Sequence, residues 1–157
     1  GEMCNRGYNT MKGYYKNPEA TAEVLDKNNF LHSGDLGIKD ENGNYRITGR
    51  LKDMIIRGGE NIYPKELEEF LYTCPKVKDV QVIGVPDKQY GEEILAEVIL
   101  KEGVGITAEE LQEYCKSHIA KHKCPRYIDF VTEFPMTGSG KVQKFKMREM
   151  MKEQIKS

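Results

Sequence analysis

The 157-residue sequence has little of what marks membrane-spanning, nucleic-acid-binding or disulfide-rich proteins. No apolar run approaches the roughly 18 residues that a transmembrane helix needs. Its 24 Lys and Arg balance 25 Asp and Glu, so the net charge of −1 gives no reason to expect nucleic acid as a partner. The four cysteines are scattered and form no disulfide pattern, which favours a reducing, cytoplasmic setting. The sequence opens on Gly1 without Met or a signal-peptide pattern, so we expect it to start inside a longer protein.

Residues 1–50 carry strand and turn signals together with one short helix. Asn17 is typical of a helix N-cap, and Pro18 suits the first helical turn. The turn-forming run 40–44 separates two segments with strand character and indicates an antiparallel pair. The elements expected here are a strand within 2–7, a helix from 18 to about 25, and strands at 30–38 and 45–48.

The pattern after Gly49 predicts a small α+β domain, in the order hairpin, helix, two strands, helix, strand, helix. Pro64 is typical of a first helical turn, and Thr107 followed by Glu110 forms a capping-box pattern. The expected elements are a hairpin within 54–64, helices at 64–72, 107–121 and 144–154, and strands at 77–85, 94–100 and 127–134.

Two glycine-containing segments are candidates for contact with a ligand. Gly58 and Gly59 can supply positive φ in a plain hairpin turn, or can leave bare backbone past which a ligand moves. The spacing alone favours the plain turn. The loop 135–141 ends in Lys141 but has Pro and Val where a Walker loop needs Gly and Ser or Thr. That loop is either a flexible exposed segment or a carrier that brings Lys141 to a phosphate or carboxylate.

Other clusters of reactive residue types give weaker patterns. Cys115, His118 and His122 are spaced to share a helix face, with Cys124 close behind, which makes a zinc site conceivable. No recognised zinc spacing matches, so we predict no metal site. The run His32–Asp35 contains the residue types of a hydrolase triad, but neighbours in sequence cannot form its line of nucleophile, base and orienting group.

Basic residues gather near the end of the helix expected at 107–121. Lys121, Lys123 and Arg126 lie in a stretch from 114 to 128 that contains no Asp or Glu. This pattern fits a solvated helix face, and it equally fits a site for an anionic ligand with several phosphates.

Four motifs occur in order over nearly the whole chain, and together they are far more specific than any one alone. They are His32-Ser33-Gly34-Asp35, the run GRLKD at 49–53, the run RGGENIYPKELE at 57–68, and PMTGSGK at 135–141. The set strongly resembles the adenylate-forming superfamily of acyl-CoA synthetases, luciferases and peptide-synthetase adenylation domains. The resemblance implies that residues 1–50 end a large AMP-binding domain and that residues 51–157 form its mobile C-terminal lid.

The resemblance also implies roles on the nucleotide side. Asp35 matches the aspartate that accepts hydrogen bonds from the ATP ribose, a task that suits a carboxylate. Arg50 matches a basic residue near the ribose and phosphates. Lys52 lies at the hinge between large domain and lid, where relatives often carry Asp. Lys141 matches the catalytic lysine of the first half-reaction.

On the CoA side, Gly58 and Gly59 match the hairpin that lines the pantetheine tunnel. Tyr90 matches a position where an aromatic ring stacks on the CoA adenine. The expected partners of the CoA phosphates are Lys121, Lys123 and Arg126.

The implied activity is an ATP-dependent acid–thiol ligase that forms an acyl-adenylate and passes the acyl group to CoA. Its cofactors are ATP and AMP, CoA, and Mg²⁺ held mainly by the large domain, and its partners are that domain and a carboxylic acid. The phosphate loop and acyl pocket of the family lie outside this sequence, so we expect the chain alone to be inactive. The alternatives are the lid of an aryl-CoA ligase, luciferase-like enzyme or peptide-synthetase adenylation domain, and a free-standing CoA-binding module.

Overall fold

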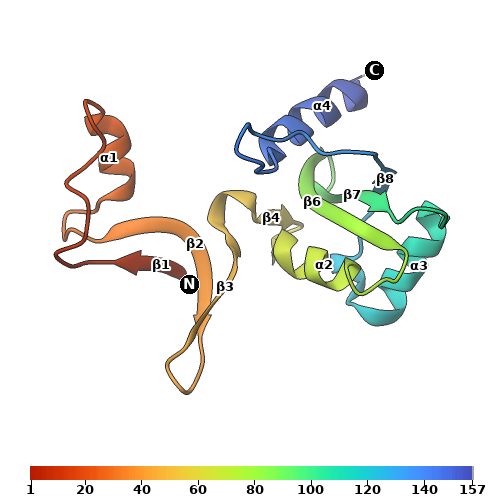
Figure 1. Ribbon diagram of the computed structural model, residues 1–157, viewed down its shortest axis with the longest axis horizontal. Coiled ribbons are helices and arrows are strands. Elements are labelled where there is room, and N and C mark those ends of the chain that lie inside the picture. The colour runs from red at the N-terminus through yellow and green to blue at the C-terminus, as the bar shows by residue number, and fades with distance from the viewer. Residues whose placement is uncertain (157) are drawn as a thin grey trace. The chain divides into compact units, whose positions relative to one another are not determined.

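The computed structural model describes residues 1–156, which divide into two compact units. The first unit is Gly1–Lys52, and the second begins at Asp53 (Figure 1). In the described part of the chain, no helix combines the length and apolar character needed to cross a membrane.

The first unit is a three-stranded antiparallel sheet with one short helix. Asn17 caps that helix, because its Oδ1 accepts the Ala20 N–H at 3.0 Å, and Pro18 occupies the first turn as predicted. The strands lie in the order β1-β2-β3. The elements are β1 (Glu2–Asn5), α1 (Pro18–Val24), β2 (Leu31–Lys39) and β3 (Tyr45–Arg50).

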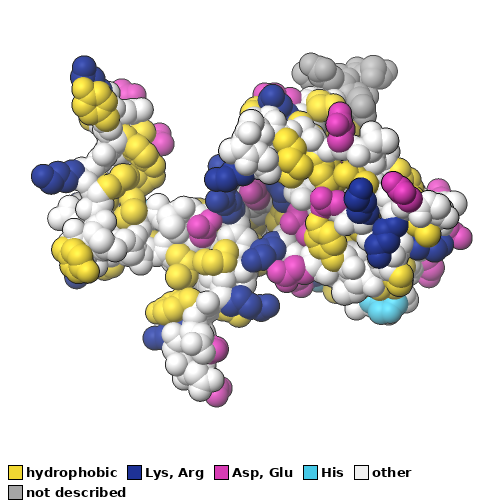
Figure 2. Space-filling view, viewed as in Figure 1, with side chains coloured by type: hydrophobic (Ala, Val, Ile, Leu, Met, Phe, Trp, Pro, Cys, Tyr) yellow, Lys and Arg dark blue, Asp and Glu magenta, His cyan; other side chains and the backbone are white. Residues whose placement is uncertain are grey.

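This first unit has almost no core of its own. Leu36 is its one buried hydrophobic side chain among the described residues, at 8% exposure. Apolar side chains gather instead on its surface (Figure 2). The large exposed ones are Tyr8, Tyr14, Tyr15, Ile38, Tyr45, Ile47 and Leu51.

The second unit is an α+β domain around a five-stranded sheet, which confirms the predicted class (Figure 1). The sheet order is β5-β4-β7-β6. Strand β4 pairs with the start of β7 at Gly91, and β8 pairs in parallel with β7 farther along, from Leu95 to Val98. The division between the units falls within the short helix η1 (Leu51–Asp53). The elements of the second unit are β4 (Ile55–Arg57), β5 (Glu60–Ile62), α2 (Pro64–Leu71), β6 (Val77–Asp87), β7 (Gly91–Leu100), α3 (Ala108–His118), η2 (Lys121–Lys123), β8 (Tyr127–Phe130) and α4 (Lys144–Lys156).

The central strands β6 and β7 are buried on both faces, because alternate side chains enter two separate cores. Val82 and Ile94 belong to a core that also contains Leu67 of α2 and Leu111 of α3. The other core is formed by Ile83, Val85, Leu95, Phe134 and Met147. Met147 belongs to α4, so α2 and α3 cover one face of the sheet and α4 the other.

Several element boundaries differ from those expected: β7 begins at Gly91 rather than 94, and β3, β6 and α4 end about two residues later than predicted. Helix α3 ends at His118 rather than near residue 121, because Ile119 turns extended and packs against the first core. Strand β8 ends at Phe130 rather than Phe134, since Val131 makes the last hydrogen bond to β7 and Phe134 enters the second core.

The early end of α3 also corrects the proposed shared helix face of Cys115, His118 and His122. His122 lies in η2, outside the helix. Cys115 is fully buried in the first core, where burial raises the pKa of its thiol to about 12. His118 packs its ring against Tyr114, with ring centroids 4.6 Å apart.

Candidate functional site

The nucleotide-side candidates Asp35 and Arg50 face each other across β2 and β3, where they are direct register partners. The Arg50 Nε donates to Asp35 Oδ1 at 3.2 Å, and the two side chains are 58% and 36% exposed. Among the described residues no further hydrogen bond reaches Asp35 Oδ2, so this oxygen remains available to a donor from solvent or a ligand.

The three residues before Asp35 fasten β2 to β1. His32 Nδ1 lies 2.8 Å from Glu2 Oε2, and the Gly34 N–H donates to Glu2 Oε1 at 3.0 Å. The hydrogen bond to Glu2 raises the pKa of His32, and the same bond lowers the pKa of Glu2. The Ser33 hydroxyl donates to the Met3 carbonyl at 2.6 Å. This part of the motif therefore stabilises the strand pair that presents Asp35.

A hollow of about 590 Å³ opens in the first unit beside Arg50. The residues lining it are Glu2, Glu23, Val24, His32, Ser33, Gly34, Arg50, Leu51 and Lys52. Its lining includes the candidate hinge Lys52 and does not include Asp35. The division between the two units falls directly after Lys52.

On the second unit, Gly58 and Gly59 form the turn between β4 and β5. Their φ values of +58° and +88° lie in the left-handed region, which a tight two-residue hairpin turn requires. A Cβ built on Gly59 would meet nothing within 4 Å, whereas one on Gly58 would lie 3.2 Å from the Tyr90 ring. One side of the turn is thus open and the other is backed by Tyr90.

The hairpin joins the main sheet through few backbone contacts. The register between β4 and β7 pairs Arg57 with Gly91, and the Gly58 N–H donates to the Tyr90 carbonyl at 2.9 Å. The side chain of Glu92 adds to these, because its Oε2 accepts the Ile56 N–H at 2.7 Å.

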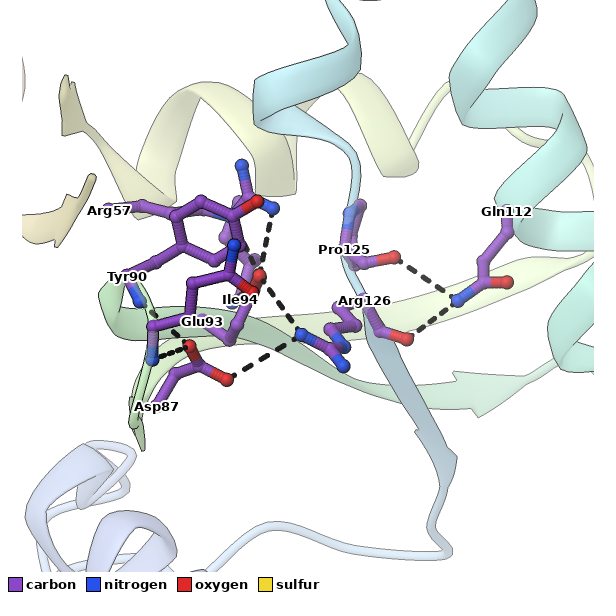
Figure 3. A network of polar contacts seen from close by, with 9 residues as sticks. Arg57, Asp87, Tyr90, Glu93, Ile94, Gln112, Pro125 and Arg126 are labelled. Atoms are coloured by element: carbon purple, nitrogen blue, oxygen red, sulfur yellow. Dashed lines mark hydrogen bonds and ion pairs between the residues drawn. The ribbon is translucent and has the colours of Figure 1, made fainter.

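A buried carboxylate, Glu93, makes the strongest contact with the hairpin (Figure 3). It is 0% exposed and binds Arg57 through two bonds of 2.8 Å, Nε to Oε2 and Nη2 to Oε1. This paired hydrogen bond raises the pKa of Arg57. Arg126 approaches the same carboxylate, with Nη1 3.6 Å from Oε1. Two cations therefore compensate the buried charge of Glu93.

Tyr90 is held between these groups. The Arg57 guanidinium carbon lies 4.6 Å from the centre of its ring, and Asp87 Oδ1 accepts the Tyr90 N–H at 2.8 Å. That backbone hydrogen bond, with a second from Gln89, lowers the pKa of Asp87. Because Arg57 covers one face of the ring, only the opposite face is available for stacking with a base.

The three candidate phosphate partners do not form one open cluster. Lys123 is paired with Glu66 at 2.6 Å, and Arg126 lies 3.5 Å from Asp87 Oδ2. Both cations are thus already paired with acids from elsewhere in the fold. Lys121 is exposed, and no described residue forms an ion pair with it.

Lys141 ends a small loop that is closed on itself. Thr137 and Lys141 exchange two bonds, Thr137 N–H to the Lys141 carbonyl at 2.8 Å and Lys141 N–H to Thr137 Oγ1 at 3.0 Å. Gly140 has a φ of +77°, which the turn needs. The Lys141 side chain is exposed, so its ammonium is presented to solvent from a loop whose backbone is held by hydrogen bonds.

The helix after this loop is anchored by two cations one turn apart. Lys144 Nζ lies 2.5 Å from Glu68 Oε1 and 3.2 Å from the Val82 carbonyl, in a site where both side chains are under 20% exposed. Arg148 Nη2 binds Asp53 Oδ1 at 3.1 Å. Both contacts fix α4, and with it the end of the Lys141 loop, to the rest of the second unit.

Sequence reasoning did not single out Glu92, Glu93 or the Lys144–Glu68 pair. A signal for Glu93 was present, because it directly precedes the apolar residues 94–96 of a strand that is buried on both faces, where a charge needs a partner. Its partner Arg57 is 36 residues away, and nothing in the local pattern links the two.

Known proteins are similar to this chain over most of its length. Residues 66–141 match the family described as AMP-binding enzyme C-terminal domain. The chain is 58% identical over 149 residues to a putative acyl-CoA synthetase, YngI, of Bacillus subtilis, covering 95% of this chain and 27% of that protein. Residues 66–141 are therefore similar to the C-terminal domain of AMP-binding enzymes, and the relatives that match nearly the whole chain are named acyl-CoA synthetases or ligases.

Further relatives are similar over nearly the whole chain. The chain is 53% identical over 155 residues to the mitochondrial medium-chain acyl-CoA ligase ACSF2 of Bos taurus, covering 99% of this chain and 25% of that protein. The structure of o-succinylbenzoate CoA synthetase (MenE) from Bacillus subtilis, in complex with an acyl-adenylate, superimposes with a TM-score of 0.83. It is 36% identical, over 97% of this chain and 30% of that one. The chain thus spans about a quarter of the length of its curated relatives.

Proposed function

We propose that the whole protein is an AMP-forming acyl-CoA synthetase and that this chain supplies its mobile C-terminal lid together with the adjoining nucleotide-side strands. In the first step, a carboxylate oxygen attacks the α-phosphorus of ATP, and pyrophosphate leaves. In the second step, the CoA sulfur attacks the acyl carbon of the adenylate, the thiol proton is lost, and AMP leaves.

Lys141 serves the first step in this proposal. Its exposed ammonium, held on a closed loop, suits stabilisation of the negative charge that develops between carboxylate and α-phosphate. Asp35 binds the ribose hydroxyls through its available oxygen, and Arg50 both orients Asp35 and adds positive charge near the phosphates. Mg²⁺ enters with ATP, and we assign it no ligand on this chain.

Gly58 and Gly59 serve the second step. The observation that carries the proposal is the open side of Gly59, where backbone of positive φ faces no other group within 4 Å. Such a surface suits the passage of a narrow thiol arm. Lys141 and this turn lie on different segments of one compact unit, so a pivot at Lys52 would exchange one for the other.

The phosphate contacts are assigned more narrowly than the sequence implied. Lys121 is the candidate with no acidic partner among the described residues, so we propose it as the first contact of the CoA phosphates. Lys123 and Arg126 would have to exchange Glu66 and Asp87 for phosphate. Tyr90 would stack on adenine with the face that Arg57 leaves open.

The partner of this chain, in our proposal, is the large AMP-binding domain of the same protein. The exposed apolar side chains of the first unit and its lack of a core support this, because a sheet of this kind is stable when another layer covers it. Cytoplasmic location is also part of the proposal and rests on four free cysteines, although relatives such as ACSF2 are mitochondrial.

The test uses the full-length protein with ATP and a panel of carboxylic acids, beginning with medium-chain acids because relatives at 52–53% identity are named for them. We expect pyrophosphate release with one class of acid and thioester formation only when CoA is added. Gly59→Leu should abolish the thioester and leave pyrophosphate exchange intact. Equal loss of both activities in a folded variant would contradict the role of the turn.

A further inference from the structure

The hairpin that carries Gly58 and Gly59 is poorly supported by its own backbone. Its strands β4 and β5 have three residues each, and the register with β7 pairs a single residue, Arg57. A two-stranded ribbon of this length is not stable by itself. Something besides the ladder must therefore fix the direction of the turn.

The adjacent carboxylates of Glu92 and Glu93 provide that support from opposite faces of β7, because successive side chains of a strand alternate. Glu92 binds the backbone N–H of Ile56, and Glu93 binds the side chain of Arg57. The two acids thus hold consecutive residues of β4, immediately before Gly58.

Glu93 does more than hold Arg57. The Arg57 guanidinium that Glu93 binds lies over the Tyr90 ring (Figure 3). Glu93 also approaches a second cation, Arg126, which pairs with Asp87. Asp87 in turn accepts the Tyr90 N–H. Tyr90 in turn accepts the Gly58 N–H at its carbonyl and backs the turn with its ring. Tyr90, which contacts the closed side of the turn, is therefore connected to one buried carboxylate through both Arg57 and the pair Arg126–Asp87.

We infer that Glu93 is a positioning residue for the thiol-transfer step: its buried carboxylate sets the Gly58–Gly59 turn, Tyr90 and Arg126 in one fixed geometry toward CoA. The inference rests on the proposed function. It assigns Glu93 no contact with substrate and no part in adenylate formation.

The experiment compares half-reactions in the full-length protein. Glu93→Gln keeps the shape of the side chain and removes its charge, which leaves Arg57 without a carboxylate. A displacement of about 1 Å at a reacting centre can cost roughly 10²-fold in rate. We expect thioester formation from supplied acyl-adenylate to fall roughly 10- to 100-fold, with pyrophosphate exchange within about twofold of the wild type.

Two further variants separate positioning from stability. Arg57→Lys keeps the positive charge, loses the paired hydrogen bond, and should produce the same selective loss at smaller size. Leu71→Ala removes a fully buried apolar side chain of α2 that takes no part in the Glu93 network, and should lower the melting temperature while leaving the ratio of the two half-reactions unchanged.

The outcomes also distinguish this inference from the function on which it rests. If Gly59→Leu blocks the thiol step but folded Glu93→Gln and Arg57→Lys do not, the positioning role is wrong and the proposed function stands. If Leu71→Ala shifts the ratio as Glu93→Gln does, Glu93 is merely structural. If the wild-type protein releases no pyrophosphate with any acid, the proposed function itself fails.

Discussion

The Lys144–Glu68 pair offers a quantitative test of how α4 is held in place. The two side chains are 17% and 15% exposed, and Nζ also donates to the Val82 carbonyl. Lys144→Met keeps most of the aliphatic stem and removes the ammonium. Glu68 then keeps one donor, the Val82 N–H at 2.9 Å, and loses its counter-ion.

The size of the effect follows from that geometry. Removing one partner of a fully buried pair costs roughly 3–5 kcal/mol, and an exposed pair contributes about 0–1 kcal/mol. With slight exposure and one remaining hydrogen bond to Glu68, we expect Lys144→Met to lower the free energy of unfolding by roughly 2 kcal/mol.

Urea denaturation of the chain at pH 7, followed by circular dichroism at 222 nm, measures this change, because α2, α3 and α4 all belong to the second unit. The double variant with Glu68→Gln should regain at least half of the loss, since no uncompensated carboxylate remains. A loss below about 0.5 kcal/mol for Lys144→Met would show that the pair behaves as a surface pair and would refute this account of α4.

Three smaller predictions concern single groups of the second unit. Burial, and then the neighbouring Asp129, raise the pKa of Glu97 above its ordinary value of 4.5, so the folded state favours the protonated acid. Glu97→Gln should therefore raise the melting temperature at pH 7 to 8, and the gain should shrink as the pH falls toward 4; a gain that grows on acidification would have the wrong sign. Thr107→Ala removes the capping box of α3 and should cost about 1 kcal/mol in urea denaturation, whereas an unchanged midpoint would mean that the cap contributes nothing. Iodoacetamide at pH 8 should modify exposed Cys4 and spare native Cys115, whose thiol has a pKa of about 12, and mass spectrometry that finds equal labelling would contradict its burial.

Local signals predicted most elements of this chain because their physical causes are local. Asn17 and Pro18 start α1, Pro64 starts α2, and Thr107 caps α3 as their side-chain chemistry requires. The end of α3 was predicted too late, because it depends on Ile119 reaching a core built from distant strands.

Only the part of the candidate site that depends on local sequence could be predicted. The positive φ of Gly58 and Gly59 follows from their place in a short turn, and the structure confirms it. The Arg57–Glu93 ion pair behind the turn was not predictable, since Glu93 meets Arg57 only after β7 pairs with β4. The phosphate roles of Lys123 and Arg126 had looked alike in a stretch without acids, but folding supplies each with an acid from another segment.

The central claim is that one compact unit serves two half-reactions with different residues. The most direct test is Lys141→Ala in the full-length protein, with pyrophosphate exchange and thioester formation from supplied acyl-adenylate measured on the same preparation. We predict that exchange falls roughly 10²- to 10³-fold, the usual cost of removing a preorganised charge donor, while thioester formation stays near the wild-type rate. An equal fall in both rates would contradict the claim.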